Sequence, residues 1–341
     1  MPVYDAVLVV SFGGPEGPDD VMPFLDNVLR GRMVSEERKR QVAEHYLHFG
    51  GKSPINDQCR ALVAALEGEL RAHGPRLPVY WGNRNWTPLL ADTLKKMADD
   101  GVKRALAFMT SAFSSYSGCR QYRENVEAAR AVVGERAPQV DKLRVFYNHP
   151  GFIGPVARNV EEALSRVPSA RRERAALAFT AHSIPKSMAS GSDYEAQLRE
   201  AARLVAEQLG RAEWKLVFQS RSGPPSQPWL DPDILDHLAS LKAEGATDVV
   251  VAPIGFISDH MEVVYDLDTE AAARARELGL DLVRASTVGT DPEFVAMIRE
   301  LIVERTDGGE RRALGDRGAS HDLCPEDCCP APAPRSPGPR P

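Results

Sequence analysis

Residues 6–12 read AVLVVSF, and similar short, almost wholly apolar runs return along the chain. Such runs are typical of parallel strands that are covered on both faces. The runs that we interpret as strands are 6–12, 79–82, 104–110, 143–147, 175–181, 215–219, 248–254 and 280–284. Stretches with helical periodicity lie between or after them, at 56–71, 88–100, 193–209, 231–243 and 292–305. This alternation predicts an α/β protein with parallel sheets.

The strand-like runs fall into two similar sets. All eight could form one large sheet, but their spacing favours two sheets of four. FMTS at 108–111 and FTAH at 179–182 end comparable strands, and the turn-rich segment NHPG at 148–151 separates the sets. We therefore predict an N-terminal domain at 1–148 and a C-terminal domain at 149–305.

The remaining residues, 306–341, form a polar tail that ends in APAPRSPGPRP. This composition cannot bury a core, so we predict that the tail is partly disordered. Three of the five cysteines crowd into it. An odd count with this distribution makes a poor disulfide framework and indicates a reducing compartment, with a metal or cluster site.

Composition excludes several classes of protein. The net charge is −6 and the basic residues are dispersed, so nothing indicates nucleic-acid binding. No apolar run approaches the roughly 20 residues that span a bilayer, and no signal-peptide pattern is visible. We expect a cytoplasmic monomer, with peripheral membrane contact left open. GGP at 13–15 and GGKSP at 50–54 fit no phosphate-loop pattern, and no G-x-S-x-G motif is present.

Candidate chemistry lies after two strands of the second set. His182 ends one strand and Glu262 follows another, and parallel sheets bind ligands beyond the carboxyl ends of their strands. Such a pair can bind a divalent metal or act as base and acid. The alternatives are structural: His182 as a buried, hydrogen-bonded histidine, and Glu262 as part of a capping box with Asp259 as N-cap.

Glu262, Asp266 and Glu270 are spaced four residues apart, which places three carboxylates in one row on a helix. Like charges in a row repel one another. One interpretation is a path that guides a hydrated cation toward Glu262, and the alternative is a solvated acidic face.

Five motifs together resemble those of ferrochelatases, in the same order, over about residues 3–305. They are SFGGP at 11–15, GGKSPI at 50–55, TAHSIP at 180–185, FQSR at 218–221 and SDHME at 258–262. The resemblance implies a chelatase fold of two Rossmann-like domains with a porphyrin between them, and insertion of Fe²⁺ in haem biosynthesis.

The resemblance also implies site residues. His182 and Glu262 would face the centre of the macrocycle and bind the metal, with Asp266 and Glu270 continuing the acidic path. The porphyrin would contact Ser53, Tyr122, Arg30, His45, Tyr46 and Phe12. Some bacterial members have an iron-binding tyrosine where Phe12 stands, so product ligation must differ here. We expect a neutral imidazole of His182 to accept the pyrrole protons; which residue binds iron first is left open.

The cysteine-containing tail and the composition, which is rich in Arg, Ala and Gly, resemble those of actinobacterial ferrochelatases, which act on coproporphyrin III and form coproheme. Protoporphyrin IX is the second candidate substrate. A non-catalytic tetrapyrrole-binding protein is a further alternative, and the presence of both His182 and Glu262 argues against it. A cobalt chelatase for a corrin precursor is another, but such enzymes are usually shorter and richer in histidine around the metal.

Some ferrochelatases bind a 2Fe–2S cluster through one internal and three C-terminal cysteines. Cys119, Cys324, Cys328 and Cys329 are similarly arranged, and four thiolates are the required number. Structural zinc and free thiols are the alternatives. The adjacent pair Cys328-Cys329 argues against the cluster, because neighbouring side chains tend to point apart. Cys59 lies in a helical stretch and is expected to be a packed residue.

Overall fold

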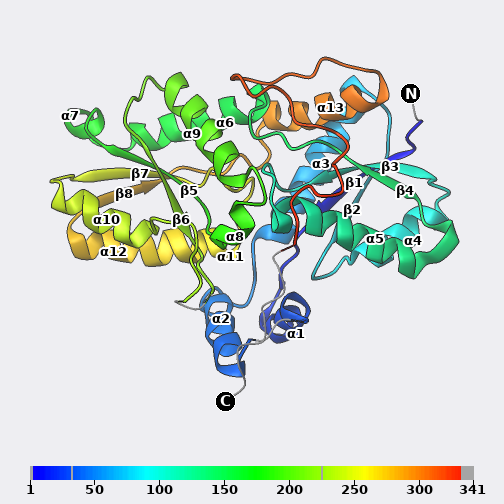
Figure 1. Cartoon of the computed structure of the whole chain (residues 1–341), viewed down its shortest axis with the longest axis horizontal. Coiled ribbons are helices and arrows are strands. Elements are labelled where there is room, and N and C mark those ends of the chain that lie inside the picture. The colour runs from blue at the N-terminus through cyan, green and yellow to red at the C-terminus, as the bar shows by residue number, and fades with distance from the viewer. Residues whose placement is uncertain (1–2, 32–33, 224–225, 332–341) are drawn as a thin grey trace.

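The computed structural model describes residues 3–31, 34–223 and 226–331. The chain forms two α/β halves that lie side by side, each built on a four-stranded parallel sheet (Figure 1). The first sheet has the order β2-β1-β3-β4 and the second β6-β5-β7-β8, so both halves share one topology. The predicted fold class and the internal repeat of four strands are confirmed.

The strands have the bounds β1 Ala6–Ser11, β2 Val79–Asn83, β3 Arg104–Met109, β4 Gln139–Lys142, β5 Ala176–His182, β6 Lys215–Gln219, β7 Asp248–Ala252 and β8 Asp281–Arg284. The central strands are buried on both faces, as their apolar sequences predict. Between or after the strands lie α1 Pro18–Leu29, α2 Glu36–His48, α3 Ile55–His73, α4 Leu90–Asp99, α5 Gln121–Val133, α6 Pro150–Ser165, α7 Ser169–Arg172, α8 Lys186–Ala189, α9 Tyr194–Gln208, α10 Ile234–Ala243, α11 Met261–Val263, α12 Ala272–Leu278 and α13 Pro292–Thr306. Three further segments are helical but not α-helical: η1 Tyr116–Arg120, η2 Gly134–Arg136 and η3 Val264–Ala271.

The fourth strand was wrongly placed by the sequence pattern. The apolar run at 143–147 is not a strand; β4 is the polar segment Gln139–Lys142 that precedes it. Among the described residues β4 pairs with β3 alone, and it forms the partly exposed edge of the sheet, where polar side chains are suitable. Residues 143–147 are buried because they pass from the sheet into the core below α13 and α6.

One core cluster joins the two halves. α13 comes from the end of the folded chain, yet it packs against α3 of the first half as well as α6. Phe146 and Phe294 pack edge to face in this region, with ring centroids 5.9 Å apart. The two sheets lie on either side of residue 148 in the sequence, but the domain bounds at 148 and 305 remain a prediction because α13 serves both halves.

Beyond α13 the chain folds back over the molecule and runs down toward its middle (Figure 1). The Asn148 side chain donates to the carbonyls of Leu314, at 3.1 Å, and Gly318, at 2.9 Å. The tail is thus tied to the segment that links the halves. Of the tail predicted at 306–341, residues 332–341, which make up nearly all of APAPRSPGPRP, lie outside the described residues, so the disorder of that stretch stays a prediction. In the part that is described, we find no helix both long enough and apolar enough for a bilayer.

Candidate active site

The structure brings His182 and Glu262 together. His182 is the last residue of β5, and Glu262 lies in α11, which follows the loop after β7. Because β5 and β7 pair in parallel, their carboxyl ends are neighbours. His182 Nε2 lies 3.4 Å from Glu262 Oε1. The pair occupies the edge of the sheet at which ligands bind in such folds.

Neighbouring side chains fix both members of the pair through their backbones. The Tyr194 hydroxyl donates to the carbonyl of His182 at 3.0 Å, and Gln219 Nε2 donates to the carbonyl of Glu262 at 2.8 Å. The N-cap of α11 is His260, whose Nδ1 accepts from the backbone N–H of Glu262 at 3.1 Å. These contacts leave the carboxylate and the imidazole face to face.

The capping-box interpretation of Glu262 is therefore wrong. Asp259, the supposed cap, instead accepts hydrogen bonds from Arg284, at 3.2 Å, and Thr287, at 3.2 Å. Its backbone N–H donates to Gln58 of α3 at 2.8 Å, which links the site loop to the first half of the molecule.

The pair is strongly polarised. Burial alone disfavours both charged forms, but the opposite charges outweigh it: Glu262 raises the pKa of His182 to about 9, and His182 lowers the pKa of Glu262 to about 2. Both side chains remain partly open to water, with 31% and 48% of their surface exposed, so solvent weakens the pairing. Without bound metal the pairing favours the charged form of His182 near pH 7, and the neutral imidazole expected during the reaction stays a prediction.

The acidic row lies on a widened helix. α11 continues into η3, a π-helix in which hydrogen bonds run from i to i+5, so residues four apart still lie nearly above one another. Ser220 donates to Asp266, and Gln219 Nε2 lies 3.5 Å from the same carboxylate. Burial, together with the charge of Glu262, raises the pKa of Asp266 to about 7.

The pKa of Glu270, the last carboxylate of the row, is also shifted. Burial, followed by the charge of Asp233, raises the pKa of Glu270. Sequence reasoning missed Asp233 and gave no role to Ser220, although FQSR at 218–221 had been singled out. Ser220 has a left-handed backbone with φ of 63°, a conformation that non-glycine residues rarely adopt outside functional sites. A uniformly solvated face does not describe the row, since Asp266 is partly buried and hydrogen-bonded.

The first half contributes aromatic and polar side chains. Arg84 lies over two of the predicted residues, with its guanidinium 5.6 Å from the Phe12 ring centroid and 4.4 Å from that of Tyr122. Ser53 is buried beside Gly14, where a Cβ would lie 2.7 Å from the Ser53 Cβ. Gly14, the second glycine of SFGGP, is therefore required for this close approach, because any side chain there would collide with Ser53.

Two residues of α2 reach toward the second half. Burial, followed by the charge of Glu262, raises the pKa of Tyr46, so its hydroxyl lies close enough to feel the Glu262 carboxylate. The His45 ring stacks on Tyr265 of η3 at 3.7 Å, with the ring planes 9° apart. Arg30 is exposed and donates to Asn27 of its own helix at 2.7 Å. The contact of Arg30 with the porphyrin stays a prediction.

A second group of reactive side chains lies where the tail meets the first half. Cys119 in η1 is brought together with Cys324, Cys328 and Cys329, and these four residues are called the cysteine cluster below. The Cys119 and Cys324 thiols hydrogen-bond one another, which raises the pKa of Cys119 and lowers that of Cys324. Arg120 fastens the tail by donating to the carbonyls of Glu326, at 2.9 Å, and Cys328, at 3.3 Å.

The adjacent cysteines point to the same side. Cys329 has a left-handed backbone with φ of 51°, and its Sγ lies 3.6 Å from that of Cys328. Two sulfurs on one tetrahedral metal, with bonds near 2.3 Å, would be about 3.8 Å apart. The geometry therefore removes the objection that neighbouring cysteines cannot share a metal centre. Cys59 is buried away from the cluster and donates to Ser11 at 3.1 Å, as expected of a packed residue.

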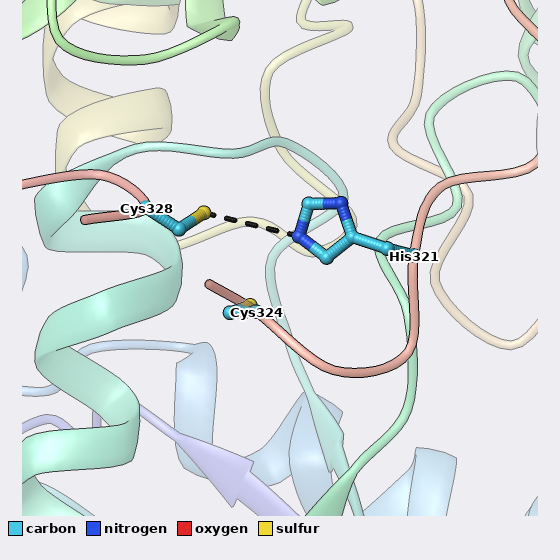
Figure 2. Close-up of side chains that lie close together, drawn as sticks. All are labelled: His321, Cys324 and Cys328. Atoms are coloured by element: carbon cyan, nitrogen blue, oxygen red, sulfur yellow. Dashed lines mark hydrogen bonds between the residues drawn. The ribbon is translucent and has the colours of Figure 1, made fainter. Parts of the chain in front are cut away.

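Sequence reasoning missed one further residue here. His321 joins Cys324 and Cys328, and the ligand atoms of the three lie within 4.8 Å of one another (Figure 2). Its place three residues before Cys324 was a signal that could have been used, because histidine near cysteines is a common metal-binding pattern.

Comparison with known proteins agrees with this geometry. A family model described as Ferrochelatase matches residues 4–306. A ferrochelatase of Rhodopirellula baltica is 58% identical over 331 residues, which cover 96% of this chain and 94% of the relative. A coproporphyrin III ferrochelatase of Streptomyces coelicolor is 54% identical over 356 residues, covering 97% and 95%.

Among solved structures, SirB from Bacillus subtilis with Fe³⁺ superposes with a TM-score of 0.56 at 13% identity, over 89% of this chain and 97% of that one. At this identity the likeness concerns the fold alone, and it agrees with the predicted chelatase architecture. The match to the family model and the identity to full-length relatives carry the assignment. The chain therefore belongs to the ferrochelatase family, the enzymes that insert a metal ion into a porphyrin.

Proposed function

We propose that this protein inserts Fe²⁺ into coproporphyrin III and forms coproheme. The observation that carries the proposal is the facing pair of His182 and Glu262 at the carboxyl ends of two paired strands. The choice of porphyrin is supported by the relative from Streptomyces coelicolor, which bears that name and aligns over nearly its whole length. Protoporphyrin IX is the alternative substrate.

In the proposed reaction, Fe²⁺ replaces the two pyrrole N–H protons of the porphyrin. Glu262 is ionised and supplies a hard oxygen ligand that exchanges readily. Iron bound to this carboxylate would cancel the charge that keeps His182 protonated, so the imidazole could release its proton to water and then take the two pyrrole protons one after the other, passing each on to water. His182 is thus made a base by the arrival of the metal and is not one beforehand.

The acidic row has a separate part in the proposal. Asp266 and Glu270 lie behind Glu262 on η3, and Ser220 orients the Asp266 carboxyl group. A carboxyl group with a pKa of about 7 exchanges protons with water near neutral pH, so Asp266 can pass on protons as well as attract the cation. Phe12 has no oxygen, so it can contact the porphyrin only through its ring.

The substrate assignment predicts a preference between two porphyrins. We expect a higher kcat/KM for coproporphyrin III than for protoporphyrin IX under anaerobic conditions with Fe²⁺, followed by the change in absorbance. Measuring both porphyrins in one buffer and detergent controls for solubility. A clear preference for protoporphyrin IX would refute the proposed substrate and leave the family assignment untouched.

The acidic row predicts graded effects of charge removal. Glu262→Gln is expected to lower kcat by about 10²-fold or more, because it removes a ligand and the partner of His182. Asp266→Asn and Glu270→Gln should mainly raise KM for iron, since they act before the metal reaches the porphyrin. As a control, Glu277→Gln removes an exposed carboxylate of α12 and should change neither constant. If kcat and KM for iron were unchanged in both row variants, the row would be only an acidic surface.

We also propose that the four residues of the cysteine cluster, Cys119, Cys324, Cys328 and Cys329, bind an inorganic 2Fe–2S group. The residues fit the group: four thiols converge, one pair of sulfurs has the spacing of a shared metal, and Arg120 holds the loop in place. The positive charge of Lys142 acts on Cys119, Cys324 and Cys328 and favours their thiolate forms. The group would supply one-electron redox chemistry away from His182. None of the five cysteines, all of which lie in the described residues, forms a disulfide, and this also supports the expected cytoplasmic location.

This proposal predicts a coloured protein. Anaerobically purified enzyme should be red-brown, with about two irons and two acid-labile sulfides per chain. Cys119→Ser should lose the chromophore, whereas Cys59→Ser, which alters a buried thiol outside the cluster, should keep it. Colourless protein containing stoichiometric zinc would instead favour a structural zinc site.

A further inference from the structure

His321 is not one of the four residues of the cysteine cluster, but its ring lies beside two of them, Cys324 and Cys328 (Figure 2). Its Nε2 is 3.8 Å from Cys328 Sγ, and it also hydrogen-bonds the thiol of Cys324. The imidazole therefore meets two sulfurs at once. The site holds five possible ligands, one more than the four that a 2Fe–2S cluster takes, so one of the five must have another role.

The backbone of Cys329 argues that this cysteine is a ligand. Its left-handed φ of 51° is unfavourable for a side chain with a Cβ, and such strain persists only where the surroundings require it. Here the strain places two neighbouring sulfurs 3.6 Å apart. Shared binding of iron by Cys328 and Cys329 explains this conformation, and it leaves His321 outside the ligand set.

The exposure of His321 agrees with this assignment. Its ring contacts the sulfurs of Cys328 and Cys324. The histidine itself is exposed to solvent, whereas Cys119 and Cys329 are buried.

The other polar residues nearby act differently. Arg120 donates to the carbonyls of Glu326 and Cys328 and so fixes the loop. Lys142 acts through its charge. His321 contacts the sulfurs themselves, and hydrogen bonds to the sulfurs are among the factors that set the reduction potential of such clusters.

We infer that His321 is an outer hydrogen-bond donor to the 2Fe–2S cluster, with its Nε2–H donating to the Cys328 sulfur and stabilising the reduced state. The inference rests on the proposed cluster. Reduction adds one electron, which makes the thiolate sulfurs more negative and strengthens an N–H···S hydrogen bond. The donor therefore raises the reduction potential without changing which residues bind iron.

The test compares two substitutions in the full-length protein at one pH. His321→Leu removes the donor, and His321→Gln restores one through its amide group. Leu323→Ala alters a neighbouring exposed side chain of the same loop and serves as the control. The measurements are iron and labile sulfide per chain, the visible and electron paramagnetic resonance spectra, and the midpoint potential from a reductive titration.

We expect His321→Leu to keep two irons, two sulfides and the wild-type type of spectrum, with a lower midpoint potential. The expected shift is roughly a tenfold lower ratio of reduced to oxidised cluster at a fixed potential, which is 59 mV for a one-electron couple. His321→Gln should recover part of it, and Leu323→Ala should not shift it.

Three results would overturn the inference. Loss of the cluster or a changed spectrum in both His321 variants would make the histidine a ligand. An unchanged potential in His321→Leu would make it a bystander. Wild-type protein with neither labile sulfide nor colour would refute the proposed cluster itself, and the inference with it.

Discussion

Replacing His182 by alanine is expected to lower kcat for iron insertion by about 10²–10⁴-fold, while coproporphyrin III still binds with nearly unchanged affinity. The range is that of a general base removed from the reacting centre. His182 Nε2 faces Glu262 at 3.4 Å, and the backbone of His182 is held by Tyr194, so the substitution removes the ring without removing the support of the strand. Turnover is measured anaerobically by absorbance, and porphyrin binding by fluorescence quenching.

Two additions make this test specific. His73→Ala changes an exposed histidine at the end of α3 and should leave kcat unchanged. Exogenous imidazole should restore part of the turnover of the His182 variant if the missing group is a proton acceptor. A folded His182→Ala protein with wild-type kcat would show that the histidine takes no part in insertion.

The same variant should report on the partner of His182. Removing the imidazole takes away the positive charge that opposes the effect of burial on Glu262, so the pKa of Glu262 should rise toward its ordinary value or above. We expect weaker iron binding at low pH in the variant as a consequence. The two residues are therefore not independent, and their effects on kcat should not be additive.

The strand ends were predictable from the sequence for a simple reason. Buried parallel strands need apolar residues on both faces, so the runs that end at His182 and precede Glu262 are conspicuous. Once the strands are placed, the topology requires their carboxyl ends to meet. The spacing of the acidic row was equally visible in the sequence. Its π-helical backbone was not, because the residue spacings expected for an α-helix and for a π-helix differ little over the eight residues of η3.

Other features depend on contacts that sequence patterns do not encode. β4 is polar because it forms an edge, so a search for apolar runs passed over it and chose the buried segment after it. His260 and not Asp259 caps the N-terminus of α11, because the Asp259 carboxylate forms an ion pair with Arg284. The proximity of His321 to the cysteine cluster depends on how the tail folds back, and no periodicity reports that path.

Removing Arg144 is expected to lower the free energy of unfolding by about 3–5 kcal/mol. Arg144 follows β4 and binds Glu304 of α13 in a bidentate pair, with both N–O distances 2.8 Å and each side chain 1% exposed. It also donates to the carbonyl of Arg312 at 2.9 Å, which ties the tail to the pair. Arg144→Met therefore leaves a buried carboxylate without its partner, and the cost comes from that uncompensated charge.

Two comparisons separate this cause from a general loss of packing. Arg144→Met combined with Glu304→Leu should recover most of the stability, because replacing a whole buried ion pair by apolar side chains is often nearly neutral. Arg158→Ala removes an arginine that is 51% exposed and paired with Asp291 and Glu293, and it should cost no more than about 1 kcal/mol. Urea denaturation followed by circular dichroism measures all three. If the double variant were as unstable as Arg144→Met, the shape of the arginine and not its charge would hold α13 against the first half.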